Sequence, residues 1–258
     1  FLLERGEIEP AKEKFNRILE FEPDHAQAIF FLGEIAFHHG DLERALDMYN
    51  SALRYDDALA GPYYRLAQHA LSQGKKKKTR AYLLSELRNS PENTELLTSI
   101  GSMFLSMACS VKTDQGTRVP PPGHSASSDL DHAVHCLLKA VDIDHAKLDT
   151  YYFLGVASAT RGDYEDASEF FAHALELERD YAPALQGLVR VRLYQGHYAQ
   201  ASQYLDKSRA IAPSDPLGKR LAWEIQWHRI YAGIEVLGKQ LASHLKRIQS
   251  RIPKRRDH

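Results

Sequence analysis

A spacing of 34 residues recurs along this sequence. Gly6, Gly40 and Gly74 stand 34 positions apart near the amino end. The same step separates later residues of matching type: Gly162 and Gly196; Ala133, Ala167 and Ala201; Leu137, Phe171 and Leu205; Ala140, Ala174 and Ser208. A fixed period of this length predicts a chain built from one supersecondary unit repeated several times, each unit burying its apolar face against the next.

The two halves of the chain share the period but are offset from one another. Gly33 and Gly155 lie 122 positions apart, which is three periods and twenty further residues. The extra residues fall between about 108 and 128, a stretch with three consecutive prolines at 120–122 and several serines. Because this composition supports neither a helix nor a core, we expect a disordered insertion there.

The repeated residues resemble the tetratricopeptide repeat pattern. The two best copies are Leu32, Gly33, Gly40, Ala45, Tyr49 and Ala52, and then Leu154, Gly155, Gly162, Ala167, Phe171 and Ala174. The resemblance implies an all-α fold, a right-handed α-solenoid of stacked helix-turn-helix hairpins with a concave inner face. Small residues at fixed positions let two antiparallel helices approach closely, while large ones fill the space between them.

We expect the array to span residues 1–213. It would contain a half-repeat at 1–25 and full repeats that start near residues 26, 60, 94, 148 and 182. Thr79 and Glu86 replace the two small residues of the third copy, and Val189 replaces the glycine of the sixth. We therefore expect those hairpins to splay slightly.

The pattern stops after Pro213, and residues 214–258 read as a long C-terminal capping helix with a basic tail. Asp215 offers an N-cap and Pro216 suits a first helical turn. The first part of the helix, which contains Trp223, would cap the end of the stack. The part from Ile230 to Ile248 has the spacing of a coiled-coil seam. It would pack on a partner helix, pack on a second copy of the chain, or fold back on the array.

The resemblance also implies where a partner binds. In this family the first helix of each hairpin lines the concave groove, at positions 2, 5, 6, 9, 12 and 13 of the repeat. These positions give an aromatic groove with scattered charge: Phe30, Phe31, Glu34, Phe37, His38, Tyr64, Arg65, Gln68, Tyr152, Phe153, Gln186, Arg190 and Tyr194. Aromatic and arginine side chains dominate the energetics of protein interfaces. About half of these side chains are expected to pack in the core instead.

One peptide-binding mode of the family is rejected. Chaperone-binding members clamp a terminal carboxylate with lysine, asparagine and arginine on three successive hairpins. The matching positions here hold Phe30 and Glu34, then Arg65, then Glu95 and Ser99. The chaperone carboxylate clamp is therefore missing.

Other constellations carry weaker signals. Lys75–Lys78 with Arg80, and the stretch Lys246–Arg256, are basic runs without the interleaved aromatics that single-stranded nucleic acid prefers, so nucleic-acid binding is disfavoured. His132, His135 and Cys136 share one predicted helix but have no fourth ligand, which argues against zinc. No phosphate-binding, dinucleotide or nucleophile-elbow motif is present, so neither an enzyme nor a cofactor is expected.

The composition agrees with a folded protein without a strong electrostatic preference. Thirty-three basic and 34 acidic side chains leave a net charge of −1, and only two cysteines are present. No apolar run is long enough for a membrane span. We expect an intracellular location, in cytoplasm or nucleus, and interpret the chain, which begins at Phe1, as a fragment of a longer protein.

The leading hypothesis is a protein–protein interaction scaffold that binds a partner peptide or helix in the groove, as a subunit of a larger multiprotein assembly. One alternative is an oligomerisation module that uses the C-terminal helix. Another is a targeting domain of a larger enzyme.

Overall fold

The computed structural model describes residues 8–109 and 128–251, and beyond residue 231 it describes mainly the backbone. Helices α1–α7 form one compact unit and α8–α12 a second. The first unit contains α1 (Ile8–Phe21), α2 (Ala26–His38), α3 (Leu42–Tyr55), α4 (Pro62–Ser72), α5 (Lys76–Asn89), α6 (Thr94–Cys109) and α7 (Ser128–Ile143). The second contains α8 (Leu148–Arg161), α9 (Tyr164–Leu177), α10 (Ala182–Tyr194), α11 (Tyr198–Ile211) and α12 (Pro216–Arg251).

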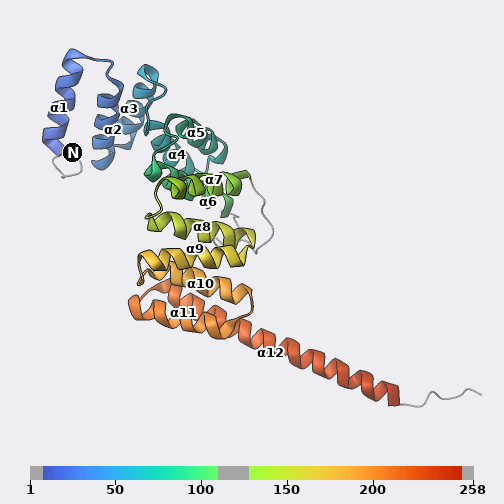
Figure 1. Ribbon diagram of the computed structural model, residues 1–258. Coiled ribbons are helices and arrows are strands. Elements are labelled where there is room, and N and C mark those ends of the chain that lie inside the picture. The colour runs from blue at the N-terminus through green and yellow to red at the C-terminus, as the bar shows by residue number, and fades with distance from the viewer. Residues whose placement is uncertain (1–7, 110–127, 252–258) are drawn as a thin grey trace, which may run out of the picture. The chain divides into compact units, whose positions relative to one another are not determined.

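The described residues contain these twelve helices and no strand, which confirms the all-α prediction (Figure 1). Each helix packs on the next within a hairpin, in the pairs α2/α3, α4/α5, α6/α7, α8/α9 and α10/α11. Successive hairpins then stack within each unit, for example α3 on α4 and α9 on α10. The predicted insertion at about 108–128 lies, except at its two edges, outside the described residues. The boundary predicted at residue 213 differs from the division into units, which falls between α7 and α8.

The hairpin turns explain the glycines of the repeat. Gly40, Gly74, Gly162 and Gly196 follow the first helix of a hairpin and have φ between 71° and 98°, the left-handed region in which a side chain is strained. No atom lies within 4 Å of a Cβ added at Gly40, so there is space for a side chain there. Glycine is needed at this position because of its backbone conformation. A left-handed residue at this point ends one helix and lets the next run back along it.

Small residues sit where the two helices of a hairpin touch. Two positions of each second helix, seven residues apart, are buried to within 1% in every hairpin: Ala45 and Ala52, Thr79 and Glu86, Ala133 and Ala140, Ala167 and Ala174, Ala201 and Ser208. Opposite them, a Cβ added to Gly155 would stand 2.6 Å from the Phe171 ring. Glycine on one helix therefore makes room for the aromatic ring of the other.

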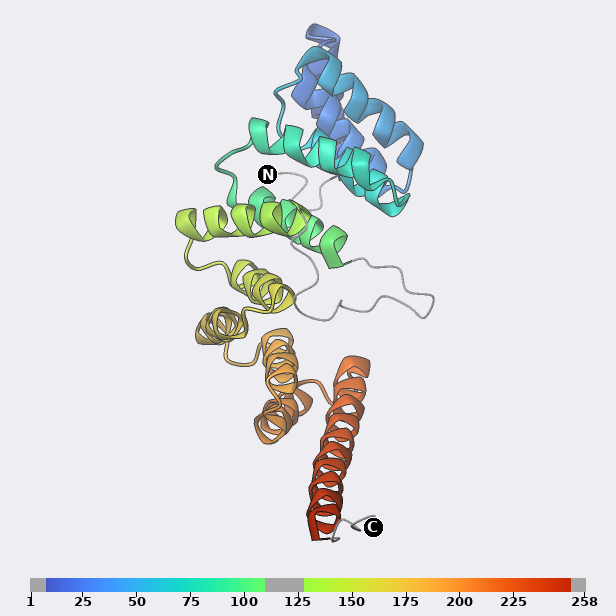
Figure 2. The same cartoon turned by 90° about the vertical axis from the view of Figure 1, so that its right-hand side faces the viewer.

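The start of α12 closes the second unit. Asp215 caps the helix, because its carboxylate accepts hydrogen bonds from the backbone N–H of Leu217 at 3.1 Å and of Gly218 at 3.2 Å. Leu221 and Ile225 are buried against α10 and α11. The capping role expected for this segment thus rests on one face of its first turns, while Trp223 on another face is 66% exposed. Figure 2 shows α12 in red as one long, continuous helix.

Candidate functional site

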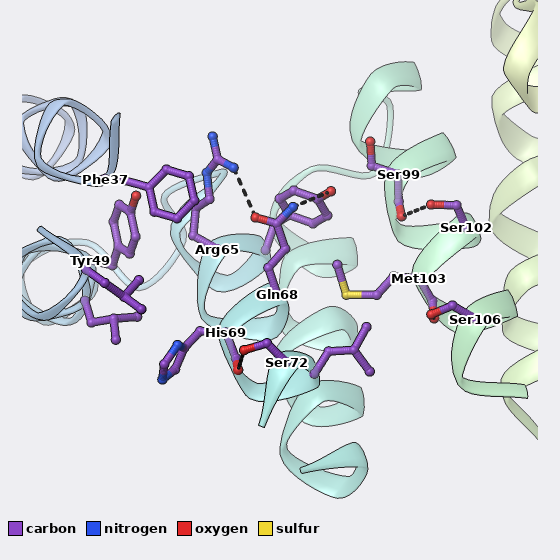
Figure 3. Close-up of a pocket in the computed structure, with 14 residues that line it drawn as sticks. Phe37, Tyr49, Arg65, Gln68, His69, Ser72, Ser99, Ser102, Met103 and Ser106 are labelled. Atoms are coloured by element: carbon purple, nitrogen blue, oxygen red, sulfur yellow. Dashed lines mark hydrogen bonds between the residues drawn. The ribbon is translucent and has the colours of Figure 1, made fainter. Parts of the chain in front are cut away.

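A groove of about 770 Å³ opens in the first unit. We call it the α4 groove, because α4 forms its floor between α2 and α3 on one side and α6 on the other (Figure 3). Its lining is mostly aliphatic, aromatic and hydroxyl-bearing: Phe37, Leu42, Leu46, Tyr49, Tyr64, Arg65, Gln68, His69, Leu71, Ser72, Ser99, Ser102, Met103 and Ser106. A cavity of this size suits a peptide segment or a small-molecule ligand equally well.

Four of the residues predicted from the sequence line this groove, namely Phe37, Tyr64, Arg65 and Gln68. Three other predicted residues of the first unit pack beside it. The half-buried ring of Phe31 stacks on Phe15 with centroids 5.2 Å apart. The ring of Phe30 covers Gly61, where an added Cβ would stand 2.7 Å from its Cζ atom. Both phenylalanines therefore join neighbouring elements of the stack.

The third such residue, Glu34, belongs to an ion pair that bridges two hairpins. Arg65 on α4 donates from Nε to Glu34 Oε1 on α2 at 2.8 Å and from Nη2 to the second carboxylate oxygen. Only 13% of the Glu34 side chain and 25% of the Arg65 side chain are exposed. A bidentate, largely buried pair of this kind fixes the position of the guanidinium and neutralises its charge.

Tyr49 reinforces the same carboxylate. Its hydroxyl donates to Glu34 Oε1 at 2.6 Å, and the residue is 1% exposed. Burial, the hydrogen bond to Glu34 and the negative charge of Glu34 together raise the pKa of Tyr49 far above its ordinary value. The hydroxyl therefore stays a donor at every physiological pH.

The remaining donors of Arg65 point along the groove. Its Nη1 atom donates to Gln68 Oε1 at 3.0 Å, and Gln68 Nε2 donates to the Tyr64 hydroxyl at 3.0 Å. The guanidinium carbon also lies 5.1 Å from the centroid of the exposed Phe37 ring. Burial lowers the pKa of Arg65, but the hydrogen bonds and charge of Glu34 outweigh it, so this pKa lies above its ordinary value.

A row of hydroxyl groups forms the wall opposite Arg65. Ser99, Ser102 and Ser106 follow one face of α6, with Met103 beside them (Figure 3). Ser102 and Ser106 donate to backbone carbonyls of their own helix at 2.8 and 2.9 Å, and the Ser102 oxygen can still accept a hydrogen bond. The prediction omitted these serines, although they occupy groove positions 6, 9 and 13 of the repeat that starts at residue 94.

Beneath the groove, Glu86 holds the beginning of α4. The N-cap of this helix is Gly61, which has no side chain to cap it. Glu86 on α5 takes over, accepting from the backbone N–H of Gly61 at 2.7 Å and of Tyr64 at 3.0 Å. Burial raises the pKa of the Glu86 carboxyl, although the N–H groups and the Ser90 hydroxyl act against that rise.

The predicted residues of the second unit lie on α8 and α10. Tyr152 packs against Phe153, Phe171 and Tyr181, with ring centroids 5.4 to 6.1 Å apart. Burial raises the pKa of the Tyr152 hydroxyl, and the charge of Arg190 nearby lowers it. This pair places a cation beside a mostly aromatic surface.

Two further predicted residues in this unit have different environments. Tyr194 is 45% exposed and stacks on Tyr164 at 5.8 Å. Gln186 is buried, and its side-chain amide donates to Ser208 at 3.2 Å and to Asp215 at 2.6 Å. Tyr194 is accessible to a partner, whereas Gln186 joins α10 to α11 and to the cap of α12.

Part of the basic run at the start of α5 is engaged within the protein. Lys76 donates from Nζ to the Met107 carbonyl oxygen at 2.8 Å, near the end of α6. Arg80 binds the carboxylate of Asp129 on α7 through Nε at 2.7 Å and Nη2 at 2.8 Å. These contacts tie α5 to both helices of the next hairpin.

The residues considered for zinc are also engaged. Cys136 is buried, which raises the pKa of its thiol to about 11, and the His132 ring stacks on Phe104 at 5.1 Å. Within residues 8–109 and 128–251, no three histidine, cysteine or carboxylate side chains gather as metal ligands. In the same ranges, no helix is long and apolar enough to cross a membrane.

Comparison with known proteins identifies the same repeat at both ends of the chain. Two family models, each described as a tetratricopeptide repeat, match residues 2–61 and 159–222. No curated protein sequence matches the chain. Three similar solved structures share 16% to 21% sequence identity with it, so they bear on the fold alone.

YrrB, described as a TPR protein with an unusual peptide-binding site, is 21% identical with a TM-score of 0.64, covering 81% of this chain and 97% of its own. A tetratricopeptide repeat protein from Parabacteroides merdae is 16% identical with a TM-score of 0.61, and the match covers 98% of this chain and 90% of that protein's chain. One chain of the APC/C hetero-tetramer Cut9–Hcn1 is 19% identical to this chain, with a TM-score of 0.61. The match covers 87% of this chain and 40% of that one.

Proposed function

Because this chain belongs to the tetratricopeptide repeat superfamily, whose fold supports protein–protein interaction, we propose that it is a scaffold that binds a segment of a partner protein in the α4 groove. Members of the superfamily are generally non-enzymatic scaffolds, and we extend that to this chain. The observation that carries the proposal is the groove itself, about 770 Å³ between three hairpins. YrrB, with its peptide-binding site, supports a peptide as the guest.

The lining favours a guest segment without a strong charge. Arg65 is the one arginine or lysine among the described lining residues, and Glu34 already neutralises it. A terminal carboxylate would have to compete with a bidentate, partly buried ion pair, which costs several kcal/mol to break. Apolar side chains such as Leu46, Leu71 and Met103 offer contact area instead. We therefore favour an extended or helical peptide with aliphatic or aromatic anchors.

Backbone groups of such a guest find partners on the serine wall. The hydroxyl oxygen of Ser102 can accept from a backbone N–H group, and the Gln68 side chain can exchange its internal bond for one to a peptide carbonyl. Side chains anchor in the apolar half of the groove while the polar half satisfies the peptide backbone. Membership of a larger multiprotein assembly follows from the same proposal, with Cut9–Hcn1 as a structural parallel.

A groove-blocking variant tests the proposal. Ser102→Trp fills the groove without disturbing the Glu34–Arg65 pair, whereas Ser85→Trp puts the same bulk on α5, outside the residues that line the groove. A displayed random peptide library is selected on the wild type and then screened on both variants. We expect selected peptides to lose at least tenfold in affinity on Ser102→Trp and to keep it on Ser85→Trp.

Equal loss on both variants, or no loss on either, would refute groove binding. A double variant separates the two units, since Tyr152→Ala with Phe153→Ala changes aromatic residues of the second unit and none that line the α4 groove. Retained binding by that double variant assigns the guest to the α4 groove alone.

A further inference from the structure

The outer part of α12 carries a row of exposed apolar side chains that the array does not cover. Trp223, Trp227, Ile230, Ile234 and Leu237 are each between 51% and 66% exposed. Single exposed apolar residues are ordinary on protein surfaces, but five in one row are typical of an interaction site. The row belongs to α12 of the second unit, whereas the α4 groove belongs to the first.

The spacing of the row is that of a helix that meets another helix. Its members alternate steps of four and three residues from Trp223 to Leu237, and the sequence continues the alternation to Leu241. This is the seam of a coiled coil, which is narrower than the apolar face of a helix that packs on a globular core. Within the row, the Trp223 and Trp227 rings lie parallel, 5.7 Å between centroids and 7° between planes.

The array already has its own, separate contact with α12. Leu221 and Ile225 point into the core with α10 and α11, and Tyr198 on α11 stacks on His228 at 6.4 Å. Residues 226–231 are all exposed, so the array stops covering the helix there. An isolated helix is marginal in water, and one with an uncovered apolar row is more so. The outer part of α12 therefore requires another helix.

Charge decides which helix can cover it. The 36 residues of α12 hold seven basic and two acidic side chains, so two such helices repel one another wherever their charged faces meet. The positions that flank the row are nearly uncharged, however: Gln226, Tyr231, Gly233, Gly238 and Gln240. The flanking Glu224 is engaged by Arg220 at 2.9 Å. Within the span of the row, Arg229 is the one lysine or arginine, and it falls on a position away from the seam, where it does not oppose pairing.

We propose that the row Trp223–Leu237 is the seam of a homodimer, covered by the same row of a second copy of the chain. A specific interface buries about 1,200 Å² or more in total. The row supplies area of that order when counted from both copies, because each covered tryptophan alone buries roughly 150 Å² or more. The pair of helices then joins two arrays, each with its own α4 groove, and a bivalent partner gains avidity from binding both.

The chain contains two tryptophans and both lie in this row, so its intrinsic tryptophan fluorescence reports on the seam. Molar mass by light scattering and the emission spectrum are measured together over a dilution series of the intact chain. We expect the mass to fall from twice the chain mass of 29.2 kDa to that mass on dilution, with a red shift of emission at the same concentrations.

Two adjacent substitutions supply the matched pair. Ile230→Asp places a charge in the seam, whereas Arg229→Asp places the same residue on the neighbouring position, away from the row. We expect Ile230→Asp to be a monomer with exposed tryptophans at all concentrations and Arg229→Asp to dimerise as the wild type does. Helicity measured by circular dichroism shows that both variants have folded.

Several outcomes would overturn the dimer. They are a single-chain mass at every concentration, a blue-shifted emission from a chain of single mass, and a dimer that survives Ile230→Asp. A single-chain protein that sediments with vesicles of anionic phospholipid would assign the row to a membrane surface instead. The groove is tested separately, since Ile230→Asp should still bind the selected peptides and Ser102→Trp should still dimerise.

Discussion

The hairpins α4/α5 and α8/α9 solve the same packing problem with different chemistry. In α8/α9 the two inner positions of the second helix are Ala167 and Ala174, as the repeat requires. In α4/α5 they are Thr79 and Glu86, which are equally buried at 0% exposure. A carboxylate thus occupies a place where the other four hairpins have a small side chain.

The difference lies in how the first helix of each hairpin begins. Neither helix has a side-chain cap at its own N-cap residue, but α4 starts at Pro62 after Gly61, and the N–H groups of Gly61 and Tyr64 bind Glu86. Helix α8 starts at Leu148, earlier in the repeat, and the N–H of Thr150 is already used by the Lys147 carbonyl at 3.2 Å. A buried carboxylate is tolerated only where hydrogen-bond donors are available to it.

The largest effect on stability is expected from placing a carboxylate in the α8/α9 hairpin, where we expect no hydrogen-bond donors to be available to it. Ala174→Glu would bury a charge without partners and should lower the free energy of unfolding by roughly 3–5 kcal/mol. The measurement is urea denaturation followed by circular dichroism. Ala172→Glu, on an exposed position of the same helix, is the control and should change stability little. Equal stability of the two variants would mean that α8 also offers donors.

Removing the carboxylate from the α4/α5 hairpin should lower the free energy of unfolding by less. Glu86→Ala restores the residue of the other hairpins but leaves the N–H groups of Gly61 and Tyr64 without their acceptor. We expect a loss of about 1–3 kcal/mol, measured in the same way. Glu92→Ala, an exposed carboxylate just beyond α5, serves as the control. Should Glu86→Ala be as stable as the wild type, the capping role of Glu86 would be wrong.

The smallest effect concerns pH. The pKa of Glu86 is raised above its ordinary value of 4.5, mainly by burial, so the folded state holds the proton more tightly than the unfolded state. This contribution to stability is full below pH 4.5 and is lost as the pH rises through the folded-state pKa. Relative to Glu86→Gln, the wild type should therefore lose unfolding free energy between pH 4 and pH 7. Parallel curves for the two proteins over that range would contradict the prediction.

The sequence predicted the elements better than their contacts. The glycines at four described hairpin turns, the small residues at Ala45 and Ala167 and the Asp215 cap all follow from local rules, and the structure places each in a turn, at a helix contact or at a helix start. The repeat itself marked Glu86 as a departure, and the splaying expected from it stays a prediction. The sequence did not predict that Glu86 would accept from the N–H of Gly61, a residue 25 positions away that meets Glu86 only after the hairpin has folded.

The candidate site shows the same limit. Family positions marked Tyr64, Arg65 and Gln68, which do line the α4 groove. They also marked Glu34 without showing that it would pair with Arg65, because that contact joins two hairpins and depends on how they stack. Opposite charges at groove positions 9 and 6 of successive repeats would have been the signal. Whether any of these residues contacts a partner remains a prediction that the groove-blocking variant tests.

The contacts of Lys76 and Arg80 have a practical consequence for protein engineering. They hold α5 to the end of α6 at Met107 and to the start of α7 at Asp129, the two points between which residues 110–127 run. Helices α6 and α7 also pack directly on each other, since a Cβ added at Gly101 would stand 2.7 Å from Leu137. The described contacts thus secure both helices of this hairpin. A reporter or affinity tag spliced between residues 110 and 127 would leave the architecture of the first unit intact.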